Sequence, residues 1–201
     1  MANLCAVEIQ AHRANDTLAI RRLLAAAPSS VELDVGVAGG ELVVAHDLDH
    51  ADASGLHLER ALELADGVPV VLDAKCFPPQ TPGVQEFAEA LRPHLTRISI
   101  CSFSEPLLAR VARLRSTVPT TLLFAEPMRI ATVARTLGPQ HTLVTRELVV
   151  AAHGVGLRVV PWTVNDVRRM AELIDLGVDG LVTDEPTLAR EVAASRLGVA
   201  A

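Results

Sequence analysis

The chain has 201 residues, of which half are hydrophobic, and its formal net charge is −6 at pH 7. This composition excludes a disordered or fibrous protein. An acidic chain is a poor candidate for sequence-independent binding of nucleic acid, and with 2% aromatic residues a platform for base stacking is not expected either. Cys5, Cys76 and Cys101 form no Cys-x-x-Cys pair, so we interpret them as small buried hydrophobic residues.

The first residues contain Glu8 and lack the basic leader of a secretory signal peptide. No apolar run approaches the roughly 18 to 20 residues of a membrane span. We therefore expect a soluble, cytoplasmic protein without stable insertion into a membrane.

Short runs rich in Val, Ile and Leu alternate with helical periodicity along the whole chain. Near-continuous apolar runs predict parallel strands that are covered on both faces. The predicted strands are 4–11, 31–35 with 42–45 close behind, 68–74, 97–101, 120–124, 142–144, 158–162 and 180–183. The predicted helices are 17–27, 56–65, 84–95, 105–114, 130–137, 147–153, 167–176 and 187–197. Asp16, Ser104 and Asn165 are expected to be N-caps.

Eight strand–helix units in succession predict an α/β protein with a (β/α)8 TIM barrel, in a single domain that spans residues 1–201. The alternative is an open, doubly wound sheet. That fold usually carries a glycine-rich phosphate loop after its first strand. Here the first strand is followed by His-Arg-Ala-Asn-Asp-Thr at 12–17, without a glycine, which favours the barrel.

Polar residues gather where the predicted strands end, which is where a barrel holds its chemistry. Glu32 and Asp34 are two residues apart, so both face the barrel interior, and Asp73 and Lys75 repeat this spacing. Inward carboxylates repel one another and need compensation. A divalent cation such as Mg²⁺ or Ca²⁺ would supply it through oxygen ligands, and ion pairs with Lys75 and Arg13 are the alternative without a metal.

Two histidines, His12 and His46, follow neighbouring strands in this arrangement. A pair of histidines flanking a phosphorus atom suits general acid and general base catalysis. The other histidines fall in loops or helical segments, and we interpret them as ordinary polar residues. They are His50, His57, His94, His141 and His153.

These motifs resemble, in order and in register, those of the glycerophosphodiester phosphodiesterases, a metal-dependent branch of the (β/α)8 barrels. The resemblance covers nearly all of the chain. The motifs are Ala11-His12-Arg13, Glu32-Leu33-Asp34-Val35, Leu42-Val43-Val44-Ala45-His46-Asp47, Asp73-Ala74-Lys75, Trp162-Thr163-Val164-Asn165 and the segment from Gly177 to Pro186.

The resemblance implies metal-dependent hydrolysis of a small phosphodiester to an alcohol and a phosphomonoester, sn-glycerol 3-phosphate for a glycerophosphodiester. It also implies a role for each matched residue. His12 and His46 would be the acid and base, and Glu32, Asp34 and Asp73 would be the metal ligands. Arg13 and Lys75 would bind the phosphate, and Trp162 would form an apolar wall beside the alcohol.

The chain departs from the family pattern at several positions. Ala14 replaces a glycine, Asp73 is one methylene shorter than the usual Glu, and the loop before Thr17 is cut short. The 26 residues from 47 to 72 leave no room for the small insertion common in the family. Two alternatives therefore stay open: a phospholipase D-like lyase of the same barrel that releases a cyclic phosphate, and a non-catalytic barrel that binds anions.

Three interpretations of single residues also stay open. Trp162 lies either beside the substrate or in the packing at the top of the barrel. Ser102 and Ser104 could touch phosphate, although capping of a helix by Ser104 is favoured. Asn165 and Asp184 are interpreted as caps and loop anchors rather than catalytic groups.

Overall fold

Parallel strands form a closed ring in the computed structural model, which describes residues 7–38, 40–47, 55–75 and 83–198. The strands of the ring, in spatial order, are β10 (Gly180–Thr183), β1 (Glu8–Ala11), β2 (Ser30–Ala38), β5 (Val70–Ala74), β6 (Ile98–Ser102), β7 (Thr120–Phe124), β8 (Thr136–Pro139) and β9 (Arg158–Val159). Backbone hydrogen bonds from Asp179 N to Val159 O (2.9 Å) and from Val182 N to Pro161 O (3.0 Å) join the last strands and close the ring. The predicted (β/α)8 barrel is thereby confirmed.

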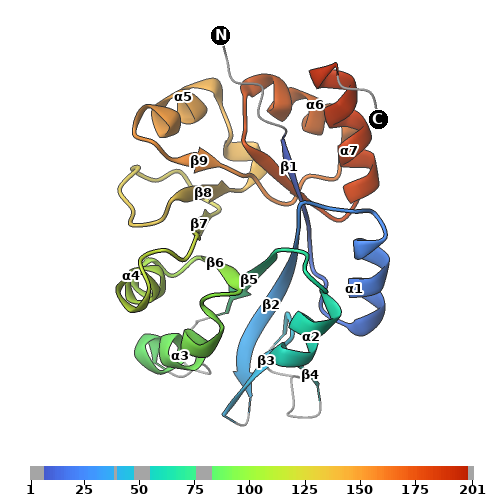
Figure 1. Ribbon diagram of the computed structural model, residues 1–201. Helices are drawn as coiled ribbons and strands as arrows, with labels where there is room; N and C mark the ends of the chain where they lie inside the picture. Colours follow the sequence, from blue (N-terminus) through green and yellow to red (C-terminus); the bar gives the residue numbers. More distant parts are fainter. Residues whose placement is uncertain (1–6, 39, 48–54, 76–82, 199–201) are drawn as a thin grey trace.

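Helices surround the ring on its outside (Figure 1). They are α1 (Thr17–Leu24), α2 (Leu58–Leu64), α3 (Val84–Leu91), α4 (Glu105–Leu114), α5 (Arg146–Gly154), α6 (Val167–Leu176) and α7 (Pro186–Leu197), with the 3₁₀ turns η1 (Arg92–His94) and η2 (His141–Leu143). Two short antiparallel strands, β3 (Glu41–Val44) and β4 (Leu56–His57), extend the sheet from β2. Among the described helices, none is long and apolar enough to cross a membrane.

Alternation along β2 explains how an acidic pair enters the barrel. Val31, Leu33 and Val35 are completely buried in the layer between strand and helices. The residues between them, Glu32 and Asp34, therefore point to the opposite side, into the ring. The predicted orientation of the two carboxylates is confirmed, because both line the cavity at its centre.

The apolar layer between strands and helices falls into two clusters. One cluster packs β2, β5, β6 and β7 against α1 to α4, with Phe87 and Leu107 completely buried in it. The other packs β8, β9 and β10 against α5 to α7, around Met170 and Leu173. Strand β1 contributes to both, through Ala11 to the first cluster and Ile9 to the second.

The predicted helix over 130–137 and the predicted strand over 142–144 are both wrong. Residues 125–135 form bends, and the segment enters β8 at Thr136. Glu105 accepts hydrogen bonds from Thr132 Oγ1 (2.7 Å) and Val133 N (2.9 Å), so the backbone N–H of Val133 bonds to a side chain and not to a helical carbonyl. Pairing of Thr136 and Leu137 with β7 then overrides the local helical pattern. Residues 141–143 form η2 instead of a strand.

Two of the three predicted N-caps are confirmed. Asp16 Oδ1 accepts hydrogen bonds from Leu18 N and Ala19 N at 2.8 Å, and Ser104 Oγ accepts one from Leu107 N at 3.3 Å. The N-cap of α6 is Asp166 rather than Asn165. The side chain of Asn165 is thereby available for a different contact.

Gly180 marks a close approach of β10 to β1 and gives a test of the ring. A Cβ atom there would lie 2.8 Å from the carbonyl oxygen of Glu8, a backbone atom that cannot turn away. We expect Gly180→Ala to lower the free energy of unfolding by about 1 to 3 kcal/mol, as overpacking typically does. Denaturant unfolding measures this change. Gly154→Ala is the control, because no atom lies within 4 Å of its Cβ position; equal losses in both variants would contradict the close approach.

Candidate functional site

All eight predicted site residues line one cavity of about 180 Å³. The cavity lies at the carboxyl ends of the parallel strands. The eight residues are His12, Arg13, Glu32, Asp34, His46, Asp73, Lys75 and Trp162. The structure therefore brings together every candidate site residue that the sequence indicated, from His12 to Trp162.

Three carboxylates form the floor of the cavity. Asp34 on β2 and Asp73 on β5 are register partners in neighbouring parallel strands, and Glu32 lies two residues before Asp34. One oxygen from each of Glu32, Asp34 and Asp73 lies within 4.8 Å of the other two. All three residues are buried. The grouping results directly from strand register and side-chain alternation.

Burial and mutual repulsion set the charges of these acids. Burial, together with the charges of Asp34 and Asp73, raises the pKa of Glu32 well above its usual value. Burial also raises the pKa of Asp73, although Lys75 opposes this shift. Burial acts in the same direction on Asp34, but hydrogen bonds from Lys75 and Asn15 and the Lys75 charge outweigh it, so the pKa of Asp34 is lowered. Asp34 is thus the most strongly ionised of the three.

The loop after β1 holds two of the acids from one side. Arg13 has a φ of 55°, an uncommon backbone conformation for a residue with a side chain. This conformation lets Arg13 N donate to Glu32 Oε2 at 2.7 Å, and Ala14 N then donates to the Glu32 carbonyl at 2.8 Å. Asn15 adds a two-way contact with Asp34: its Nδ2 donates to Asp34 Oδ2 (2.5 Å), and its Oδ1 accepts from Asp34 N (2.9 Å). The shortened loop thus fixes both ligand candidates on β2.

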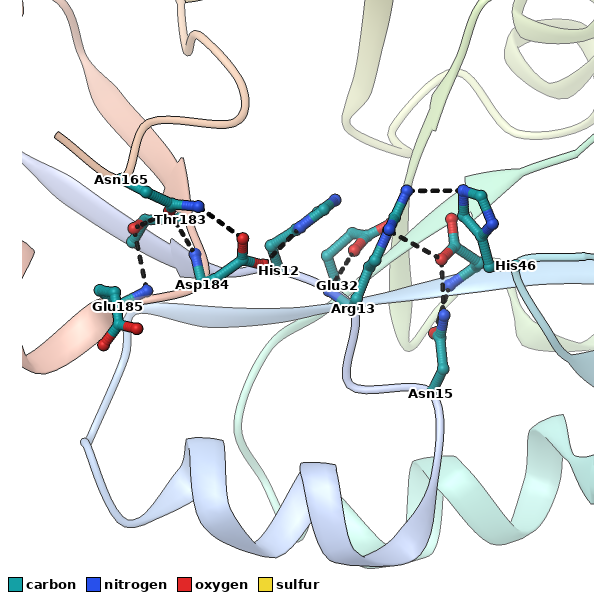
Figure 2. A network of polar contacts seen from close by, with 10 residues as sticks. His12, Arg13, Asn15, Glu32, His46, Asn165, Thr183, Asp184 and Glu185 are labelled. Atoms are coloured by element: carbon teal, nitrogen blue, oxygen red, sulfur yellow. Dashed lines mark hydrogen bonds and ion pairs between the residues drawn. The ribbon is translucent and has the colours of Figure 1, made fainter.

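His12 is oriented by a chain of polar side chains from the last strands (Figure 2). Its Nδ1 lies 2.8 Å from Asp184 Oδ1, and Asn165 Nδ2 donates to Asp184 Oδ2 at 2.6 Å. Thr183 Oγ1 in turn donates to Asn165 Oδ1 at 3.0 Å. A carboxylate only accepts, so His12 Nδ1 donates the proton and Nε2 is the nitrogen left for chemistry.

The interpretation of Asp184 as a loop anchor is incomplete, because Asp184 contacts His12 directly. Burial alone would raise its pKa, but the hydrogen bonds from His12 and Asn165 outweigh burial and lower the pKa of Asp184. The contact joins residues 172 positions apart. The sequence could have indicated this contact only through the expectation that the last strand of a barrel, β10, pairs with the first, β1.

His46 contacts Arg13 on the exposed side of the cavity. Arg13 Nη2 lies 2.6 Å from His46 Nε2. A guanidinium group has no acceptor, so His46 Nε2 accepts in this contact and the imidazole proton is on Nδ1. Arg13 Nε also lies 3.9 Å from Asp34 Oδ2. The guanidinium thus lies between the acids and the second histidine.

Trp162 packs at the top of the barrel and also lines the cavity. Its Nε1 donates to the Gly138 carbonyl at 2.7 Å, which fixes the ring against β8. Its ring packs edge-on against Phe103, with centroids 5.5 Å apart, and both rings line the cavity. An apolar wall therefore faces the charged floor.

The remaining residues singled out in the sequence have other places in the structure, although Cys101 also lines the cavity. Cys101 is buried, and burial raises the pKa of its thiol; Cys5, Cys76 and His50 lie outside the described residues. Ser102 donates to the Ala74 carbonyl at 2.9 Å, and Ser104 caps α4. The other histidines contact acids of the outer surface, except His141: His57 contacts Glu41, His94 contacts Glu59 and His153 contacts Asp179.

The donor set fits a hard divalent cation. Carboxylate oxygens are the ligands that Mg²⁺ and Ca²⁺ prefer. Asp73 Oδ1 is buried and has no hydrogen-bond partner among the described residues, which leaves one oxygen of the cluster directed at no protein donor. A buried acceptor without a partner is costly, so an unpaired oxygen beside two further acids indicates a cation site.

The fold and the cavity place the chain among the (β/α)8 barrels that have a cluster of carboxylates, suited to a metal ion, at the carboxyl ends of their strands. Residues 77–188 match the model of the glycerophosphoryl diester phosphodiesterase family, which is more than half of the chain. The chain therefore belongs to this family. Of the eight candidate site residues, only Trp162 falls inside the matched segment. The other seven rest on the geometry described above.

Named relatives match part of the chain. A glycerophosphodiester phosphodiesterase of Caldanaerobacter subterraneus subsp. tengcongensis is 31% identical over 114 residues, which are 52% of this chain and 47% of that protein. One of Bacillus subtilis is 34% identical over 106 residues, 48% of this chain and 36% of that protein. The match thus spans less than half the length of either relative.

Solved structures share the fold over nearly the whole chain. A provisionally named glycerophosphoryl diester phosphodiesterase of Silicibacter pomeroyi has a TM-score of 0.85 at 22% identity, with 98% of this chain and 96% of that chain covered. An Oleispira antarctica phosphodiesterase, solved in complex with the product sn-glycerol-3-phosphate, has a TM-score of 0.81 at 17% identity, with 92% and 96% covered.

The raised pKa of Glu32 gives a test of the acidic floor. A carboxyl whose pKa is raised by folding contributes stability below its unfolded pKa, and this contribution is lost as the pH rises through the folded pKa. We expect the contribution of Glu32 to the free energy of unfolding of the metal-free protein to fall as the pH rises above about 4.5, the usual pKa of Glu. Glu32→Gln should flatten this slope and be more stable than the wild type at pH 7.

Denaturant unfolding at a series of pH values in the presence of a chelator measures both effects. Glu191→Gln on α7 is the matched control, since this glutamate is exposed. If Glu32→Gln keeps the slope of the wild type, Glu32 is not the group that titrates.

Proposed function

We propose that the protein is a divalent-cation-dependent phosphodiesterase that hydrolyses a glycerophosphodiester to an alcohol and sn-glycerol 3-phosphate. The observation that carries this proposal is the convergence of three buried carboxylates, two histidines and two cationic side chains on one cavity. Family membership and the product named for the Oleispira antarctica neighbour support the same substrate class.

Glu32, Asp34 and Asp73 would hold the cation. When bound, a divalent cation acts as a Lewis acid that offsets the charge on the phosphoryl oxygens. Asp73 is a shorter side chain than Glu, and Mg²⁺ tolerates little distortion of its octahedral shell, whereas Ca²⁺ accepts longer and more variable bonds. We propose Mg²⁺ or Ca²⁺ as the cofactor.

His12 and His46 are proposed as the acid and base. His12 is held through Nδ1 by Asp184, so Nε2 is the ring nitrogen that would exchange a proton with the substrate. His46 Nε2 accepts from Arg13 in the free protein. A bound phosphate, carrying a negative charge, would draw the Arg13 guanidinium to its own oxygens and leave His46 Nε2 able to take a proton.

Arg13 and Lys75 would bind the phosphate oxygens, and Trp162 with Phe103 would contact the alcohol. The four side chains line the same cavity, with the cations near the acidic floor and the rings on the apolar wall. This division orients the diester, because its charged phosphate and its less polar alcohol face different surfaces. Transition-state charge is then offset by groups already in place.

The proposal is tested with purified protein, a panel of glycerophosphodiesters and added Mg²⁺ or Ca²⁺. We expect release of sn-glycerol 3-phosphate, and loss of turnover with a chelator. His12→Asn and His46→Asn should each lower turnover by about two orders of magnitude, the usual scale for acid–base groups.

Three results would contradict parts of this proposal. Full turnover in chelator contradicts the cation, and near-normal turnover in either histidine variant contradicts the role of that residue. A cyclic phosphate as the final product would identify the lyase alternative instead.

Asp184 is proposed as a positioning residue that acts through His12. We expect Asp184→Asn to lower kcat by about ten- to a thousandfold with little change in KM, because an amide can favour the wrong tautomer of the ring. The readouts are the pH profile of kcat and the nitrogen NMR signals of His12. If kcat and the His12 signals stay unchanged, Asp184 only anchors its loop.

A further inference from the structure

Lys75 already places a positive charge among the acids that would hold the metal. Its Nζ lies 2.7 Å from Asp34 Oδ1 and also contacts Asp73 Oδ2. Only 13% of the Lys75 side chain is exposed. The ammonium group is thus enclosed between two of the three carboxylates.

Most oxygens of the cluster are engaged in this arrangement. Asp34 Oδ1 and Asp73 Oδ2 accept from Lys75, Asp34 Oδ2 accepts from Asn15, and Glu32 Oε2 accepts from Arg13 N. Within the described part of the chain, Asp73 Oδ1 has no hydrogen-bond partner, and Asp73 is only 7% exposed, so water does not readily replace one. This buried oxygen indicates a site for a cation. Two neighbouring oxygens, Asp34 Oδ1 and Asp73 Oδ2, already face the Lys75 ammonium group.

A divalent cation and the Lys75 ammonium therefore compete for the same oxygens. Carboxylate oxygens can be shared, but two positive charges held within a few ångströms in a buried site repel strongly. The cation would bind best after Lys75 has moved away. The side chain of Asn15 is hydrogen-bonded to both the backbone N–H and the carboxylate of Asp34. Asp34 would therefore keep its position while its Oδ1 is released from Lys75.

The phosphate of a substrate offers Lys75 an alternative partner, because Lys75 also lines the cavity. We propose that Lys75 is an internal cation that competes with the divalent cation, and that phosphate binding removes this competition. Metal and phosphate then bind with positive cooperativity. This inference rests on the proposed function, since it takes the same acids as ligands and the same cavity as the phosphate site.

Thermodynamic linkage makes the coupling measurable without turnover, because each ligand must strengthen the other by the same factor. Calorimetry compares Mg²⁺ binding to the wild type in the absence and presence of saturating sn-glycerol 3-phosphate, with Mg²⁺ titrated into that ligand alone as the blank. We expect the affinity for Mg²⁺ to rise about tenfold or more, within the usual range of such coupling.

Lys75→Met and Arg13→Met form a matched pair of variants. Each removes one positive charge near Asp34, since Arg13 Nε lies 3.9 Å from Asp34 Oδ2. We expect Lys75→Met alone to bind Mg²⁺ several-fold more tightly than the wild type without phosphate, and to lose most of the coupling. Arg13→Met should leave the affinity for Mg²⁺ alone much closer to that of the wild type.

Several outcomes would overturn the inference. One is that the wild type binds Mg²⁺ with equal affinity with and without the phosphomonoester, or binds no Mg²⁺ under either condition. Another is that Lys75→Met and Arg13→Met gain affinity for Mg²⁺ equally. If Lys75→Met fails to fold, a crystal structure of the wild type with both Mg²⁺ and the phosphomonoester bound decides the question. The inference is refuted if Lys75 still contacts Asp34 and Asp73 in that structure. Coupling without hydrolysis of any diester refutes only the proposed function, and hydrolysis without coupling refutes only this inference.

Discussion

The site depends on one electrostatic constraint: three carboxylates are buried together at the end of two neighbouring strands. Side-chain alternation places Glu32 and Asp34 on the inner face of β2, and strand register places Asp73 beside Asp34. Such a group is unstable without compensation. Lys75, Asn15 and the backbone of Arg13 supply it from the ends of β5 and β1. The short loop after β1 and the left-handed conformation of Arg13 follow from the need to bring donors to these oxygens.

Much of this arrangement could be predicted from the sequence, because it follows from local periodicity. The spacing of Glu32 and Asp34, and of Asp73 and Lys75, indicates their orientation once a strand is recognised. The segment 130–137 shows where local pattern fails. Its apolar spacing is helical, but hydrogen bonds to Glu105 and pairing with β7 decide its structure. The partner of His12 was also missed, since Asp184 reaches it only when the ring closes.

The family match and the site occupy different parts of the chain. The matched segment begins at residue 77, after both histidines and all three acids. Seven site residues lie between His12 and Lys75, on β2 and β5 and in the loops that follow β1, β3 and β5. The short β1 loop, Ala14 and Asp73 also lie in this part of the chain. The departures from the family pattern are thus concentrated where the metal and phosphate would bind.

The division of the outer core into two clusters has a consequence for how the site is assembled during folding. The cluster around Phe87 supports β2 and β5, so the strands that carry the acids and precede Lys75 pack on one apolar cluster. The cluster around Met170 supports β10 and, with it, Asp184. The two clusters meet at β1, and on the far side of the ring at β7 and β8, where the connecting residues 125–135 form no helix. Units of this kind can open separately. The acidic floor of the cavity therefore depends on only one half of the barrel core, whereas the orientation of His12 requires that both halves are docked.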